Sequence, residues 1–148
     1  MELEILKKEL IEDEGVKYEV YLDHLGYKTF GIGHLCKATD PENDFDVGQE
    51  VSKERVDECF SKDIDRVIED CTILYDDFFA LPDEAQLIIA NMMFNLGRPR
   101  LTNFVRMRKA VNEHNWQEAK IQMLDSKWAR QVPNRAKRLS ERMGNITV

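Results

Sequence analysis

The sequence predicts a predominantly helical α+β domain with a small β lobe near the N-terminus and a helical lobe toward the C-terminus. The chain of 148 residues has the usual length of one domain. Most apolar residues recur at helical spacing, whereas residues 16–22 alternate polar and apolar side chains as strands do and residues 27–32 form a second β-rich run. We therefore expect a single domain, 1–148, with lobes at about residues 12–60 and about 75–148 in addition to the N-terminal helix.

The first 32 residues predict a helix followed by a β-hairpin. Residues 3–12 place Leu and Ile at helical spacing with charges between them. Gly15 favours the end of this helix, because glycine is common just beyond a helix C-terminus. Residues 16–22 and 27–32 have strand patterns on either side of a short turn, so the two strands are expected to form a hairpin.

The segment after the hairpin predicts a bend, a surface loop and a long helix. Gly31 and Gly33 indicate a bend or a close backbone approach. Residues 37–50 are acidic and contain turn-forming residues, which is typical of a loop. Ser52 is placed to cap a helix whose apolar stripe reaches Cys71, and this helix is expected to join the two lobes.

The remaining sequence predicts the helical lobe. Pro82 opens a helix that Gly97 closes, and its middle is apolar nearly all round, which is typical of a helix at the centre of a core. Asn115, followed three residues later by Glu118, has the pattern of a helix N-cap. Three shorter helices are expected at about 103–112, 116–125 and 134–143.

The charge is distributed unevenly along the chain. The net charge is −7, but residues 1–97 hold 24 acidic and 9 basic side chains, whereas residues 98–148 hold 4 and 12. This asymmetry indicates either an anionic partner for the C-terminal part or two oppositely charged faces that meet within one fold. A nucleic-acid partner is not expected, because the sequence has no recognisable nucleic-acid module and the acidic half would repel phosphate.

The cysteines and the N-terminus indicate where the protein is made. Cys36, Cys59 and Cys71 form an odd set, which predicts reduced thiols, and the last two fall among apolar positions typical of a core. Metal-binding spacings such as CxxC or HExxH are missing from the sequence, so no metal is expected. The first residues are too charged for a signal peptide. We expect synthesis in the cytosol, followed by release or delivery through another factor.

Two carboxylates near the hairpin are candidates for chemistry. Glu14 ends the first helix, Asp23 lies in the hairpin turn, and Thr29 is on the second strand. A glutamate and an aspartate in one cleft can act as acid and base on a glycosidic bond. Because the chain contains 28 acidic residues, spacing alone leaves a coincidental pair as the simpler explanation.

Three blocks of sequence resemble the phage-type lysozymes, the muramidase endolysins. The segment from Asp13-Glu14-Gly15 to Gly33-His34-Leu35 resembles their catalytic motif, with the pattern E-G-x7-D-x5-T followed by G-x-G-H. Residues 90–97 resemble their central helix, and residues 126–138 resemble their C-terminal signature. The blocks occur in family order. The resemblance implies a lysozyme-like fold in which a long helix joins a β-hairpin lobe to a helical lobe.

The resemblance also implies a reaction and roles for its residues. The expected activity is hydrolysis of the β-1,4 bond between N-acetylmuramic acid and N-acetylglucosamine in peptidoglycan, without a cofactor. Glu14 would be the general acid, and Asp23 with Thr29 would orient or activate water. The family is held to invert the anomeric centre, which requires carboxyl groups roughly 6.5–9.5 Å apart. Arg135 matches a family arginine that pairs with the catalytic glutamate.

Further site residues follow from the resemblance. His34 and Asp63 match a structural ion pair rather than a catalytic dyad. Asn95 stands where the family commonly has a glutamine, which is one methylene longer. Trp128 and Met93 are predicted to be core residues. The expected sugar-site residues are Leu35, Phe94, Asn95 and Phe104.

Two classes of function remain at this point. One is an active muramidase, and the other is a non-catalytic lysozyme-fold module that binds peptidoglycan or a protein partner. The presence of Glu14, Asp23 and Thr29 favours the enzyme, which is expected to be a monomer. The basic C-terminal part is expected to meet the anionic wall through a set that includes Arg98, Arg100, Lys127 and Arg130.

Overall fold

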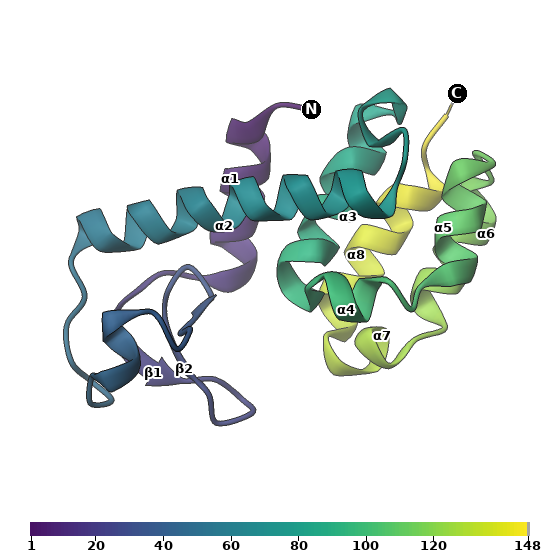
Figure 1. Ribbon diagram of the computed structural model, residues 1–148. Coiled ribbons are helices and arrows are strands. Elements are labelled where there is room, and N and C mark those ends of the chain that lie inside the picture. Colours follow the sequence, from purple (N-terminus) through teal and green to yellow (C-terminus); the bar gives the residue numbers. More distant parts are fainter. Residues whose placement is uncertain (148) are drawn as a thin grey trace. The chain divides into compact units, whose positions relative to one another are not determined.

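The computed structural model describes residues 1–147 and confirms a predominantly helical α+β fold with a small antiparallel sheet (Figure 1). The elements in chain order are α1 (Leu3–Glu14), β1 (Lys17–Leu22), β2 (Lys28–Gly31), β3 (His34–Leu35), η1 (Pro41–Asp44), α2 (Lys53–Leu74), η2 (Phe78–Ala80), α3 (Asp83–Leu96), α4 (Arg98–Leu101), α5 (Val105–Asn112), α6 (Trp116–Leu124), α7 (Lys127–Gln131) and α8 (Pro133–Gly144).

The residues group into two compact units. One unit, called here the N-terminal unit, is Lys7–Arg66. The other, called the C-terminal unit, combines Met1–Leu6 with the chain from Val67 onward. Both α1 and α2 therefore contribute residues to each unit.

The sheet of the N-terminal unit has the strand order β1-β2-β3, with both pairs antiparallel. The register of β1 on β2 shifts between Lys17 and Tyr21, so the alternation of side chains does not continue through the strand. Val20 is fully buried, whereas Tyr18 and Leu22 remain about half exposed. Strict alternation would place these three residues on one face, and the register shift accounts for their different burial.

The β2–β3 turn packs closely against α2. Gly31 and Gly33 both have positive φ, and Ile32 between them is 4% exposed. A Cβ on Gly31 would lie 3.0 Å from Cγ1 of Val56 on α2. The bend expected at these glycines is present, and it brings the sheet and the helix together because Gly31 has no side chain.

The C-terminal unit is built around α3, which packs against α4 and α8 (Figure 1). All nine residues from Ala85 to Met93 are buried, as the apolar pattern predicted. Asn115 caps α6 by accepting from the backbone N–H of Glu118 at 3.3 Å, again as predicted. Ser126 caps α7 in the same way by accepting from Ala129 at 3.1 Å.

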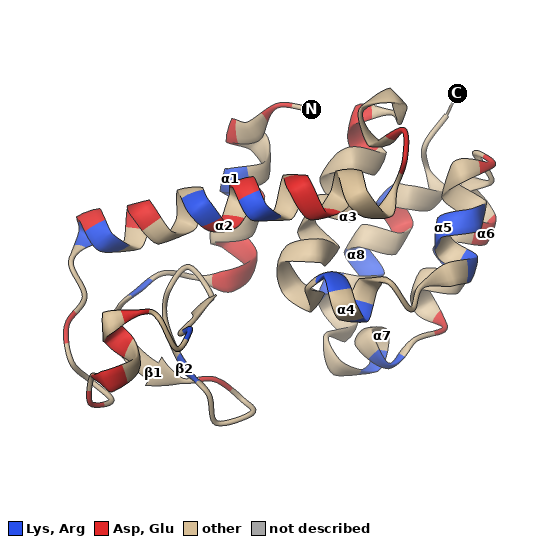
Figure 2. Cartoon of the chain, viewed as in Figure 1, with Lys and Arg blue, Asp and Glu red and all other residues tan. Residues whose placement is uncertain are grey.

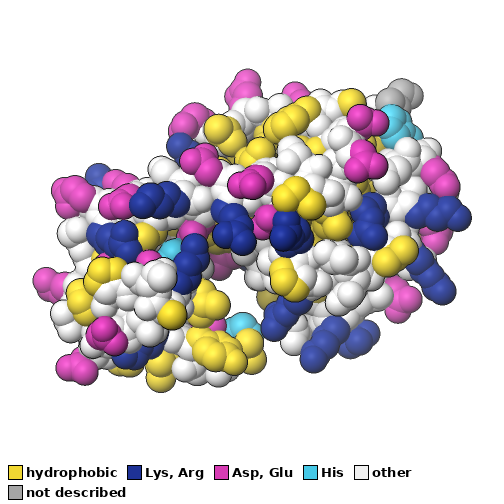
Figure 3. All heavy atoms as spheres, in the orientation of Figure 1, with side chains coloured by type: hydrophobic (Ala, Val, Ile, Leu, Met, Phe, Trp, Pro, Cys, Tyr) yellow, Lys and Arg dark blue, Asp and Glu magenta, His cyan; other side chains and the backbone are white. Residues whose placement is uncertain are grey.

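The two units differ less in net charge than the two parts of the sequence do, because the C-terminal unit combines segments from both. The N-terminal unit contains 16 acidic and 9 basic residues, whereas the C-terminal unit contains 12 of each. Figure 2 shows basic residues on α4, α5, α7 and α8. In Figure 3, Lys and Arg side chains gather on the lower part of the C-terminal unit. In the described part of the chain, no helix is both long and apolar enough to cross a membrane.

Candidate active site

Glu14 is the last residue of α1, and its position follows from how that helix ends. Gly15 takes a φ of 73°, and its N–H donates to the carbonyl of Ile11 at 2.9 Å. This left-handed glycine stops the helix directly after Glu14. The carboxyl group lies against the β2–β3 turn, because a Cβ built on Gly33 would be 2.8 Å from Oε1 of Glu14.

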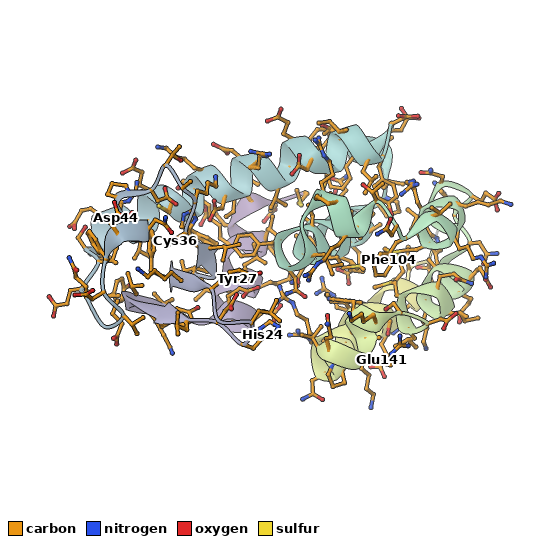
Figure 4. All side chains as sticks on the ribbon, turned by 60° about the horizontal axis from the view of Figure 1, so that its bottom comes forward. His24, Tyr27, Cys36, Asp44, Phe104 and Glu141 are labelled. Atoms are coloured by element: carbon orange, nitrogen blue, oxygen red, sulfur yellow. The ribbon has the colours of Figure 1, made fainter. Side chains whose placement is uncertain are left out.

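Asp23 is held by the backbone of its own turn. Its Oδ1 accepts hydrogen bonds from the N–H groups of Leu25 and Tyr27, each at 2.9 Å. The N–H of Asp23 also donates to the carbonyl of Tyr27 at 2.9 Å. Figure 4 labels His24 and Tyr27 in this turn. Because both side-chain bonds fall on Oδ1, the turn fixes the direction of the carboxylate.

Thr29 is buried in β2, with 4% of its surface exposed. Its Oγ1 donates to the carbonyl of Tyr27 at 3.1 Å. Tyr27 thus links Thr29 and Asp23, since its carbonyl accepts from both residues and its N–H donates to the aspartate. The hydroxyl proton of Thr29 is engaged by this bond, so its oxygen can act as an acceptor toward water.

Tyr21 was not among the residues predicted from sequence. It is the cross-strand partner of Thr29, and the ammonium of Lys17 lies 4.4 Å from the centre of its ring. Burial raises the pKa of the Tyr21 hydroxyl, and the charges of Glu14 and Asp23 raise it further. Tyr21 therefore lies in the field of both carboxylates. Its position on the first hairpin strand, nearly opposite Thr29, is the sequence signal that could have identified it.

His34 lies between two carboxylates. Its Nδ1 is 2.6 Å from Oδ2 of Asp63, and its Nε2 is 2.9 Å from Oδ2 of Asp40. Burial alone would lower the pKa of this histidine, but the hydrogen bonds to Asp63 and Asp40 raise it above its ordinary value. The sequence named Asp63 and missed Asp40, because Asp40 belongs to the segment predicted only as a surface loop.

Arg55 extends this group of charges. Its Nε donates to Oε2 of Glu42 at 2.9 Å, and its Nη2 donates to Oδ1 of Asp40 at 3.2 Å. Glu42 is 5% exposed, and its hydrogen bond raises the pKa of Arg55. These contacts fasten the loop around η1 to α2. Within residues 1–147, no group of three His, Cys, Asp or Glu side chains is arranged to hold a metal ion.

The C-terminal unit carries most of the predicted sugar-site residues. Asn95 accepts a hydrogen bond from Nε1 of Trp128 at 2.7 Å, and Trp128 meets Phe104 edge-on with ring centres 6.3 Å apart. Phe94 is half-buried. Leu35 differs in belonging to the N-terminal unit, where it is 52% exposed on β3.

Arg135 lies on α8, in the C-terminal unit. Its Nε donates to Oδ1 of Asn91 at 2.9 Å, and Asn91 is fully buried in α3. As predicted for core residues, Trp128 is 3% exposed and Met93 is 1% exposed.

A cavity of about 580 Å³ opens in the C-terminal unit. Phe104, Met107 and Trp128 supply apolar lining. Basic side chains also line it, namely Arg100, Arg106 and Lys127. Figure 4 shows Phe104 among the helices of this unit. The carboxylate of Asp125 also lines the cavity, which therefore combines an aromatic surface with three cations and one anion.

The fold is of the lysozyme-like α+β class. A sequence model of phage lysozymes matches residues 11–144, and the chain belongs to the phage lysozyme family. The probable T4-type lysozymes 2 and 1 of Dictyostelium discoideum are 30% and 31% identical to it, over 90% of both chains in each case. The peptidoglycan hydrolase gp36 of Pseudomonas phage phiKMV is 28% identical over 93% of this chain and 15% of its own length. These relationships support peptidoglycan hydrolysis as the class of activity.

The His34 group generates a pH-dependent prediction. A raised folded pKa stabilises the protein fully below the unfolded pKa of about 6.5, and the contribution disappears as pH rises through the folded pKa. The backbone N–H of Lys37 and the side chain of His34 more than offset burial and lower the pKa of Asp40, whose contribution is lost as pH falls through that lowered value. We expect His34→Asn to reduce the free energy of unfolding by about 1.5–3 kcal/mol near pH 5, and by less on either side.

Urea unfolding across the pH range measures this difference. The exposed residue His24 offers a matched control. His24→Asn should lower the free energy of unfolding only slightly, with no maximum in the difference near pH 5. A constant difference between wild type and His34→Asn at all pH values would contradict the charged role of His34.

The position of Tyr21 generates a second prediction. Removing the charge of Glu14 should lower the Tyr21 pKa toward its ordinary value of about 10, because one source of repulsion is lost. NMR titration of ¹³Cζ-labelled tyrosine in wild type and Glu14→Gln measures the shift, with Tyr21→Phe identifying the resonance. Glu12→Gln, at an exposed position of the same helix, should leave the Tyr21 pKa unchanged. An equal response to both variants would show that Tyr21 does not face Glu14.

Proposed function

We propose that the protein is a muramidase that hydrolyses the β-1,4 bond between N-acetylmuramic acid and N-acetylglucosamine in peptidoglycan. One observation carries the proposal: the carboxyl of Glu14 lies against the β2–β3 turn of the same small sheet whose hairpin holds Asp23 and Thr29. An acid at a helix end and a fixed carboxylate on a hairpin are the two groups that glycoside hydrolysis requires. Membership of the phage lysozyme family supports the choice of substrate.

The proposed mechanism is a single displacement with inversion. Glu14 donates its proton to the glycosidic oxygen as the bond to the leaving sugar breaks. Asp23 accepts a proton from water as the water attacks the anomeric carbon, and Oγ1 of Thr29 accepts a hydrogen bond from that water. The backbone donors on Oδ1 of Asp23 support this role, because they keep the carboxylate aligned through main-chain groups. Proton transfers and attack by water complete the reaction, so the proposal includes no cofactor.

Binding of the polymer is assigned to the predicted contact residues and to positive charge. Leu35, Phe94, Asn95 and Phe104 are the proposed sugar contacts. Arg100 and Lys127 of the basic surface proposed from the sequence line the cavity, and Arg106 extends that surface. Arg98 belongs less fully to that surface, because its Nη1 lies 3.3 Å from Oδ1 of Asp70.

We further propose that the protein reaches the bacterial cell wall by release or by delivery through another factor.

Replacing the acid tests the reaction. Glu14→Gln keeps the side-chain shape but cannot donate a proton, so clearing of a peptidoglycan suspension should fall by about 10²–10⁴-fold. Glu12→Gln, in the same helix, should retain wild-type activity. Borohydride reduction of the products identifies the sugar at the new reducing end, and ¹H NMR of the fresh product gives its anomeric configuration.

The outcomes separate the two classes of function. Clearing by wild type alone, with N-acetylmuramic acid at the new reducing ends, supports the muramidase. If wild type and Glu14→Gln both bind the wall and neither clears it, the protein is a non-catalytic lysozyme-fold module. A retained β-anomer as the first product would exclude inversion.

The basic surface generates a separate prediction about salt. In a Glu14→Gln background, which prevents digestion, Arg100→Gln with Lys127→Gln should weaken binding to anionic peptidoglycan several-fold at low salt. It should also flatten the dependence of binding on ionic strength, because exposed charges act through a screened field. Lys37→Gln with Lys53→Gln removes the same charge from exposed positions of the N-terminal unit and is the control. Binding that does not change with salt would exclude an electrostatic role for this surface.

A further inference from the structure

We propose that Gly33 is a positioning residue whose missing side chain sets the place of the Glu14 carboxyl. This inference rests on the proposed function, in which Glu14 is the acid. A Cβ at position 33 would lie 2.8 Å from Oε1, 3.1 Å from Cδ and 3.3 Å from Cγ of Glu14. These three nearest atoms belong to one side chain, so the Gly33 backbone forms a wall against which the carboxyl rests.

The β2–β3 turn is held on both sides of Gly33. On one side of Gly33, Ile32 is buried in the core of the N-terminal unit. On the other side, His34 pairs with Phe30 across the β2–β3 ladder and is held by Asp63 and Asp40. Because a methyl group at position 33 would meet the end of a side chain on one side and this braced turn on the other, we expect the Glu14 carboxyl to move.

Displacement of the acid predicts a specific kinetic defect. A catalytic group moved by about 1 Å loses on the order of 10²-fold in rate, because its proton no longer lies in line with the leaving oxygen. Substrate binding does not depend on that alignment. Gly33→Ala should thus lower kcat by about 10²-fold while KM stays close to wild type.

Two other glycines separate this effect from backbone strain. Gly31 has a φ of 64°, close to the 60° of Gly33, but its Cβ would meet Val56 instead of Glu14. Gly48 has a φ of 93°, and its nearest contact would be an ordinary 3.9 Å. Gly31→Ala and Gly48→Ala should therefore lower Tm, because alanine is strained at these angles, and should leave kcat unchanged below that temperature.

The experiment measures kcat, KM and Tm on soluble peptidoglycan fragments, well below the Tm of each variant. Gly33→Asn is included, because asparagine tolerates positive φ but still adds the Cβ. This variant should be more stable than Gly33→Ala and have an equally low kcat.

A double-mutant cycle with Glu14→Asp adds a second test. The shorter side chain withdraws the carboxyl from the new methyl, so Gly33→Ala should cost little further activity in that background.

The results separate the two ideas. A loss of kcat confined to the position-33 variants, with non-additivity in the cycle, supports the positioning role. Equal kcat in the alanine variants at positions 31, 33 and 48, together with an inactive Glu14→Gln, overturns the role of Gly33 and leaves the proposed acid intact. An active Glu14→Gln would overturn the proposed acid itself.

Discussion

The N-terminal unit depends on the contacts of His34 with the carboxylates of Asp63 and Asp40. The imidazole bonds to α2 through Asp63 and to the following loop through Asp40, while its backbone pairs within the sheet. Sheet, helix and loop are thereby joined at one buried side chain. Each ring nitrogen has a carboxylate partner, so the charged form is compensated on both sides despite burial. The glycine turn that precedes His34 takes its rigidity from this arrangement.

The proposed catalytic groups are positioned mainly by the backbone. Glu14 is placed by the end of α1 and by the backbone at Gly33. Asp23 is placed by backbone amides of its own turn. Backbone groups in a hydrogen-bonded hairpin cannot rotate away as side chains can, which makes them suitable supports for groups that must be held in line. Tyr21 adds a polar neighbour to both carboxylates from the adjoining strand.

The sequence predicted the long elements and missed the short ones, for a physical reason. A helix such as α3 repeats its apolar residues over several turns, and the glycine after it marks its end. By contrast, α4 and α7 have four and five residues, too few to show a period, although Ser126 supplies a capping signal for α7. Motif positions identified Glu14, Asp23 and Thr29. Asp40 could not be identified in this way, because a side-chain contact from a loop residue follows no regular spacing. Tyr21 lies opposite Thr29 in the hairpin, a signal that the motif does not include.

The loop around η1 is more than a surface connection of variable composition. Its Asp40 and Glu42 receive a histidine and an arginine from the rest of the N-terminal unit, and both carboxylates are largely removed from solvent. Some of the acidic residues of this protein therefore form ion pairs within its own fold. An exchange of this loop with that of another member of the family would have to supply two carboxylates in the same places. Without them, His34 would keep Asp63 as its one carboxylate partner, and Arg55 would keep its contact with Glu58 on α2.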